Sequence, residues 1–120
     1  MAKKTLVLGA SLNSSRYSYM AINKLREQNI EVVAFGLREG LVKDVDVLKE
    51  KLDYVDLDTI TLYLSPKNQE SYYDYILGLK PKRVIFNPGT ENSELIEILK
   101  KNGIKAEIAC TLVLLSTNQY

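Results

Sequence analysis

The stretch K-T-L-V-L-G-A-S-L-N-S-S-R at residues 4–16 decides the fold. Its apolar run Thr5–Leu8 is typical of a strand that is buried on both faces. Gly9–Ser11 ends this strand, and a helical pattern begins near Ser14 or Ser15. The first backbone N–H groups of a helix have no partners inside the helix, and the helix dipole favours negative charge there. The stretch therefore predicts a strand–turn–helix unit whose turn suits an anion such as phosphate.

Strand and helix patterns alternate along the rest of the chain. The predicted strands are Thr5–Leu8, Glu31–Phe35, Thr59–Leu64, Val84–Phe86 and Ile104–Ile108. The predicted helices are Ser15–Gln28, Ser65 to about Gly78, and a third that begins at Asn92 or Ser93 and ends at Asn102-Gly103. Residues 37–58 leave room for a short strand and a helical turn, and Thr111–Leu115 is an apolar closing segment. This alternation predicts βαβ crossovers and a mostly parallel sheet with helices on both faces.

Composition excludes several classes of protein. The 120 residues predict one domain over residues 1–120, with 46% apolar residues to form its core. The net charge is +1 and the charged residues are interleaved, so we expect no nucleic acid partner. The apolar runs are too short to span a bilayer, and no signal peptide is evident, so we expect no membrane association. A homodimer or a partner protein stays open.

Cysteine and histidine counts limit the chemistry further. A single cysteine, Cys110, rules out an internal disulfide framework and fits the reducing cytoplasm, where we expect the protein to be. The chain has no histidine, which excludes Ser-His-Asp and Cys-His catalysis and His-based metal sites. We therefore expect no metal site and favour binding over catalysis, although Asp, Glu, Lys, Ser or Tyr can still serve an enzyme.

The segments that directly follow the strands form the candidate site, because ligands of open α/β sheets bind at the carboxyl ends of the strands. They are Gly9–Arg16, Gly36–Glu39, Ser65–Asn68 and Asn87–Asn92. The first segment has one glycine of the dinucleotide pattern G-x-G-x-x-G and lacks the lysine of a P-loop. Arg16 near the helix start opposes the helix dipole, which a bound phosphate would explain. A tight turn with ordinary serine capping and a solvated arginine is the alternative.

The end of the second strand bears on which nucleotide is bound. NAD-binding folds place an acidic residue there for the ribose hydroxyls, whereas this chain has Phe35, Gly36, Leu37 and Arg38. An arginine suits a ribose phosphate, which means NADP or the 3′-phosphate of coenzyme A. A plain surface charge at Arg38 is the alternative. For the segment Asn87–Asn92, a turn followed by a helix cap is an equally sufficient interpretation.

Four stretches, taken in order, resemble the single-domain CoA-binding proteins, which look like the CoA-binding domain of the succinyl-CoA synthetase α subunit standing alone. They are V-L-G-A-S-L-N-S-S-R-Y-S-Y, T-I-T-L-Y-L-S-P-K-N-Q, V-I-F-N-P-G-T-E-N and A-C-T-L-V-L-L-S. The resemblance implies an α/β, Rossmann-like three-layer sandwich with a five-stranded parallel sheet of order 3-2-1-4-5 and helices on both faces. It also implies non-catalytic binding of coenzyme A or an acyl-CoA.

The resemblance further implies which residues touch the ligand. Those at the phosphate turn are Gly9, Ala10, Ser11, Asn13, Ser15, Arg16 and Tyr17; those by the adenosine are Phe35, Gly36 and Arg38; those flanking the ligand are Tyr63, Leu64 and Ser65; and those closing the far side are Asn87, Gly89, Glu91 and Asn92. Many relatives have an N-P motif where this chain has Gly36-Leu37. The phosphohistidine of the synthetases belongs to a second domain, so ligase chemistry does not transfer.

Two other functions remain open from the sequence. The first is an NADP-dependent reductase or redox sensor on the same fold, for which the missing acid after Phe35 is the discriminating feature. The second is an interaction domain that has kept the fold and lost its ligand. In that case Arg16 and Arg38 would have no effect on nucleotide binding.

Overall fold

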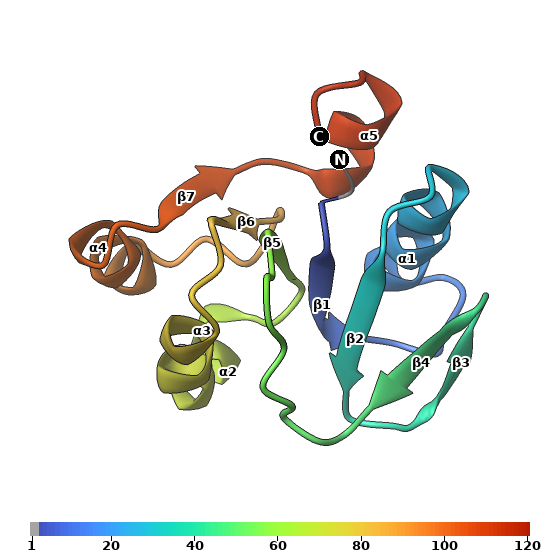
Figure 1. The fold of residues 1–120 in the computed structure, drawn as a ribbon, viewed down its shortest axis with the longest axis horizontal. Coiled ribbons are helices and arrows are strands. Elements are labelled where there is room, and N and C mark those ends of the chain that lie inside the picture. Colours follow the sequence, from blue (N-terminus) through green and yellow to red (C-terminus); the bar gives the residue numbers. More distant parts are fainter. Residues whose placement is uncertain (1–2) are drawn as a thin grey trace.

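The computed structural model describes residues 3–120, and its elements alternate as the sequence predicts (Figure 1). The strands are β1 (Thr5–Ala10), β2 (Val32–Gly36), β3 (Gly40–Val42), β4 (Val45–Leu48), β5 (Thr59–Leu62), β6 (Arg83–Phe86) and β7 (Lys105–Ile108). The helices are α1 (Tyr17–Glu27), α2 (Pro66–Gln69), the 3-10 turn η1 (Glu70–Tyr72), α3 (Tyr73–Leu79), α4 (Ser93–Lys101) and α5 (Thr111–Ser116). No helix among these residues is long and apolar enough to cross a membrane.

The strands form one sheet of order β3-β4-β2-β1-β5-β6-β7. Strand β1 lies in the middle, where Thr5 is level with Val32 of β2 and with Thr59 of β5. All neighbouring strands are parallel except β3 and β4, which are antiparallel. The α/β class is confirmed, but the expected five-stranded parallel sheet is wrong. The expected order 3-2-1-4-5 counts the short strand within residues 37–58 as strand 3, so it corresponds to β4-β2-β1-β5-β6. Strand β7 is added at one edge of the sheet and β3 at the other.

The β3–β4 hairpin is the main feature that the expected five-stranded sheet lacks. Its tight turn places Lys43 in the left-handed region at φ 56°. Asp44 in the same turn is held by Arg26 of α1, at 2.8 Å between Nη2 and Oδ2. The valines Val42, Val45 and Val47 are buried, so the hairpin adds apolar surface to the core. Short apolar pieces in a charged stretch therefore formed two strands rather than one strand and a helical turn.

Helices cover both faces of the sheet, with α1 and α5 on one side and α2, α3 and α4 on the other (Figure 1). The core on the α3 and α4 side includes Leu6 and Phe86 of the sheet, with Ile76 of α3 and Leu95 of α4. The core on the α1 and α5 side includes Val7, Ala34, Val47, Ile22 of α1 and Leu115 of α5. Successive residues of β1 thus serve opposite cores, as the alternation of strand side chains requires.

Three helical segments differ from their predicted form. Helix α1 begins at Tyr17, with Arg16 at the N-cap position, so neither Ser14 nor Ser15 is the cap. The predicted helix Ser65 to Gly78 is divided into α2, η1 and α3. The apolar closing segment is helix α5.

Candidate functional site

A cleft with a volume of about 640 Å³ opens at the carboxyl ends of the central strands. Its walls come from the loops after β1, β2, β5 and β6, and from the start of α1 and the η1 turn. The lining residues are Gly9, Ala10, Ser11, Leu12, Arg16, Tyr17, Ser18, Phe35, Gly36, Leu37, Arg38, Tyr63, Leu64, Ser65, Asn68, Tyr72, Pro88, Gly89 and Thr90. This is the position at which open α/β sheets bind their ligands.

The loop between β1 and α1 is held by its own side chains. The Asn13 backbone N–H donates to Ser11 Oγ at 3.0 Å, and the Ser15 N–H donates to Asn13 Oδ1 at 2.9 Å. The Ser11 N–H donates to Ser18 Oγ of α1 at 3.1 Å. These bonds fix the turn without using the first N–H groups of the helix.

The amino end of α1 has unpaired donors and no acid. Arg16 O accepts the Met20 N–H at 3.2 Å, and among residues 3–120 the three preceding N–H groups, of residues 17 to 19, have no protein acceptor. The first turn contains no acidic residue. The arrangement provides backbone donors and a positive helix end beside the cleft, which together favour an anion.

Two glycines allow the loops to approach each other at the base of the cleft. Gly9 has φ +98°, and a Cβ there would lie 2.9 Å from the Tyr63 carbonyl carbon. A Cβ on Gly36 would overlap the carbonyl oxygen of Ala10. Both positions therefore require glycine, because the obstacles are backbone atoms that cannot rotate away.

The charge in the cleft is of one sign. Arg16 and Arg38 are the charged side chains among the lining residues that the structure describes. Both are exposed, and within residues 3–120 neither forms an ion pair. Since no carboxylate of residues 3–120 lines the cleft, its field attracts anions.

Aromatic side chains also line the cleft. Phe35 and Tyr72 pack edge to face, with ring centroids 5.5 Å apart, and the Lys51 ammonium lies 4.7 Å from the Tyr72 ring centroid. Burial raises the pKa of Tyr63 to about 12. The Tyr63 phenol is therefore protonated at neutral pH and is a poor general base there.

The structure brings most of the predicted site residues together. Those that line the cleft are Gly9, Ala10, Ser11, Arg16, Tyr17, Phe35, Gly36, Arg38, Tyr63, Leu64, Ser65 and Gly89. Those that do not line it are Asn13, Ser15, Asn87, Glu91 and Asn92. Lining residues that were not singled out are Leu12, Ser18, Leu37, Asn68, Tyr72, Pro88 and Thr90. Five of these belong to the segments after the strands, so only Ser18 and Tyr72 lay outside the predicted regions.

Asn87 supports the cleft from beneath. It is 2% exposed, its Nδ2 donates to Thr61 Oγ1 at 2.6 Å and to Leu62 O at 2.9 Å, and its Oδ1 accepts the Thr111 N–H at 2.9 Å. These bonds use both ends of the amide and join β5, β6 and α5. Asn87 thus fixes the position of the loop that follows it.

Asn92 and Glu91 also bond within the protein. Asn92 caps α4 by accepting the Leu95 N–H at 3.2 Å, and its Nδ2 donates to Gln69 Oε1 at 3.0 Å. Glu91 Oε1 accepts the Gly89 N–H at 2.8 Å. These contacts join α2 to the loop after β6.

A second cavity of about 490 Å³ lies between α1 and α5. Met20, Leu112, Val113 and Leu115 give it a mainly apolar wall. It lies between helices, away from the strand ends and their converging loops. Within residues 3–120 no three His, Cys, Asp or Glu side chains gather in a form that could hold a metal ion.

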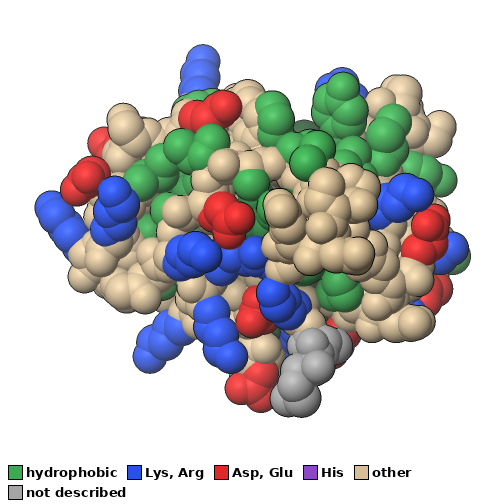
Figure 2. All heavy atoms as spheres, turned by 90° about the horizontal axis from the view of Figure 1, so that it is seen from above, with side chains coloured by type: hydrophobic (Ala, Val, Ile, Leu, Met, Phe, Trp, Pro, Cys, Tyr) green, Lys and Arg blue, Asp and Glu red, His purple; other side chains and the backbone are tan. Residues whose placement is uncertain are grey.

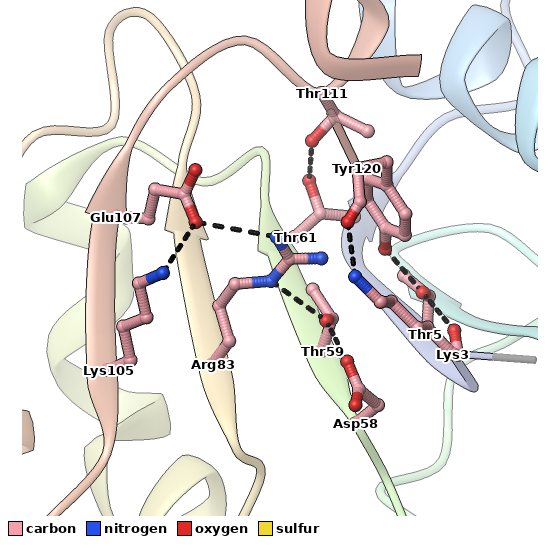
Figure 3. Close-up of polar contacts among 10 residues, drawn as sticks. All are labelled: Lys3, Thr5, Asp58, Thr59, Thr61, Arg83, Lys105, Glu107, Thr111 and Tyr120. Atoms are coloured by element: carbon pink, nitrogen blue, oxygen red, sulfur yellow. Dashed lines mark hydrogen bonds and ion pairs between the residues drawn. The ribbon is translucent and has the colours of Figure 1, made fainter. Parts of the chain in front are cut away.

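The opposite, amino-terminal edge of the sheet has a different arginine site (Figure 3). Arg83 is 9% exposed; its Nε donates to Thr59 Oγ1 at 3.1 Å, and its Nη1 lies 3.4 Å from Glu107 Oε1. The guanidinium carbon lies 4.6 Å from the ring centroid of Tyr120, and the Tyr120 phenol bonds to Thr5 Oγ1. Arg83 Nη2 is buried without a hydrogen-bond partner among the described residues.

The sequence matches the model of one protein family, described as "CoA binding domain", over residues 3–116. A solved crystal structure of an uncharacterized protein is 49% identical, with a TM-score of 0.97 over 100% of this chain and 99% of that one. A Thermus thermophilus protein is 22% identical, with a TM-score of 0.87 over 99% of this chain and 91% of that one. A hypothetical protein of Pyrococcus horikoshii OT3 is 22% identical, with a TM-score of 0.84 over 97% and 83%. No curated protein matched.

Proposed function

The chain belongs to the CoA binding domain family, and from this premise we propose that its cleft binds coenzyme A without transforming it. The single observation that supports the proposal most strongly is the charge of the cleft, where both charged lining side chains are arginines. Arg16 is adjacent to the free N–H groups of α1, which suits a pyrophosphate. Arg38 follows β2, where it suits the 3′-phosphate of the ribose.

The groups that line the cleft favour binding over catalysis. The chain has no histidine, and no carboxylate lines the cleft in the described part of the chain. Tyr63, with its pKa of about 12, keeps its proton at neutral pH. A ligand would therefore meet hydrogen-bond donors and aromatic surface, and no group suited to accept a proton at neutral pH.

The test is calorimetric titration of the full chain with coenzyme A. Charge-assisted hydrogen bonds contribute roughly 1.5–3 kcal/mol each, so we expect Arg16→Ala and Arg38→Ala each to weaken binding about tenfold to a hundredfold. Lys101→Ala, which removes an exposed cation from the end of α4, is the matched control and should bind as the unmodified chain does.

Two ligand comparisons separate the remaining functions. The unmodified chain should bind dephospho-CoA more weakly than coenzyme A. Arg38→Ala should weaken the binding of dephospho-CoA little further, because the phosphate that Arg38 would contact is absent. Tighter binding of NADP than of coenzyme A would favour the reductase. Absence of binding by both at millimolar concentration would refute the proposed function and favour an interaction domain.

A further inference from the structure

The outer strand β7 leaves backbone groups without partners at one side of the sheet (Figure 1). The Lys105 N–H donates to Lys82 O, next to β6, at 3.2 Å. Because alternate residues of a strand direct their N–H and C=O groups to opposite sides, those of Ala106 and Ile108 point away from β6. Within residues 3–120 no strand lies beyond β7, so these groups are able to pair with a further strand.

The sequence I-K-A-E-I at residues 104–108, which contains β7, is complementary to itself when read in the opposite direction. Lys105 and Glu107 flank Ala106 on one face of the strand, with Nζ and Oε1 3.8 Å apart. When two copies of β7 pair antiparallel about Ala106, Lys105 of each copy lies opposite Glu107 of the other. On the other face isoleucine lies opposite isoleucine, and Ile108 is 63% exposed in the single chain. A twofold axis therefore repeats every favourable contact.

The hydrogen-bonding pattern fits the same arrangement. In an antiparallel ladder centred on Ala106, the two copies of this residue exchange N–H···O=C bonds, because their groups point outward. Lys105 and Glu107 then occupy the non-hydrogen-bonded positions, where opposing side chains are closest. Charge and backbone orientation therefore favour one register.

We propose that β7 pairs with β7 of a second copy, which forms a twofold dimer and joins the two sheets into one. Strand β3 at the other side of the sheet, Gly40–Val42, has no charged residue to select a partner. None of residues 104–108 lines the cleft, so the pairing does not depend on the proposed function. Interfaces below about 1,200 Å² are typical of weak association, and this short strand pair leads us to expect a dissociation constant of about 10–100 μM.

Sedimentation equilibrium of the full chain, at concentrations that span this dissociation constant, tests the dimer. Lys105→Glu places like charges opposite each other, and we expect it to weaken the dimer about tenfold to a hundredfold. Lys49→Glu makes the same change in charge at an exposed residue after β4 and should leave the dimer unchanged. A chain that stays monomeric throughout, or a dimer that Lys105→Glu does not weaken, would overturn the proposal.

A mixture of two charge variants tests the register. Glu107→Lys alone should also weaken the dimer, but an equal mixture with Lys105→Glu should dimerise again, because each glutamate then faces a lysine. Absence of this recovery between two folded variants would overturn the pairing about Ala106.

A further variant keeps the test independent of the charges, since Glu107 also contacts Arg83 and its replacement could disturb the fold. Ala106→Pro removes an N–H that β6 does not use, and proline is tolerated at such positions of edge strands. We expect this variant to melt as a folded chain by circular dichroism and to lose the dimer. A folded Ala106→Pro that dimerises as strongly as the unmodified chain would overturn the proposal.

Discussion

The arginines at the carboxyl ends of the strands, here called the carboxyl edge, differ from the arginine at the amino ends, here called the amino edge. At the carboxyl edge, Arg16 and Arg38 are exposed and form no ion pair within the described chain. At the amino edge, Arg83 is buried between Thr59, Glu107 and the ring of Tyr120. Seen from the side of α5 (Figure 2), Lys and Arg side chains also lie among Asp and Glu side chains.

This difference separates a structural arginine from one available to a ligand. An arginine with a carboxylate, a hydroxyl and a ring around it stabilises the fold, and in Arg83 these partners leave only Nη2 without a hydrogen bond among the described residues. Arginines that form no ion pair gain no attraction from a carboxylate in the free protein. A bound anion would supply that attraction. We therefore expect the two kinds of arginine to differ in how much stability their removal costs.

The largest effect is expected at the amino edge. Arg83→Ala removes one of the two cations paired with Glu107, the other being Lys105, and it also breaks the bond to Thr59 and empties the space against Tyr120. We therefore expect a loss of about 2–4 kcal/mol in the free energy of unfolding. Urea denaturation measures it. Arg16→Ala is the matched variant at the carboxyl edge and should cost less than about 0.5 kcal/mol. Similar losses in both variants would mean that the two arginines contribute alike to the stability of the fold.

A smaller loss of stability is expected at high pH, from the partly buried cleft residue Tyr63. Burial raises the pKa of Tyr63 to about 12, from 10.0. The unfolded chain therefore releases this proton before the folded chain does. The associated stability is fully present below pH 10 and is lost as pH rises from 10 to about 12, with a slope of at most about 1.4 kcal/mol per pH unit.

Denaturant midpoints measured across this pH range would test the alkaline effect. Tyr63→Phe should reduce the slope, since the variant has no proton to release at that position. Tyr17→Phe removes an exposed phenol and is the control, which should keep the slope of the unmodified chain. An unchanged slope in Tyr63→Phe would contradict the role of its burial.

The sequence was sufficient for the central fold and for the region of the site. Short apolar runs and helical spacing, with glycine and asparagine at their ends, identified the strands from Thr5–Leu8 to Ile104–Ile108, because each pattern reflects burial within its own segment. The β3–β4 hairpin was missed, since its alternation is only a few residues long and its core contacts come from α1 and β2. Long-range packing of this kind has no local signature.

The same limit applies to the site. Position after a strand was enough to locate most of the cleft, because all parallel strands end at one edge. It could not show that the Asn87 amide would form hydrogen bonds with Thr61, Leu62 and Thr111. Nor could it place Tyr72 against Phe35, because the break between α2 and α3 that presents its ring was predicted as a continuous helix.

Amide chemical shifts measured by NMR during titration with coenzyme A report where on the molecule the ligand binds. We expect shifts concentrated in Gly9–Ser18 and Gly36–Arg38, beside the carboxyl ends of the strands, and little change at Thr59, Arg83 and Lys105 at the amino ends. Shifts concentrated at the amino ends, or none at saturating ligand, would mean that the cleft is not the binding site.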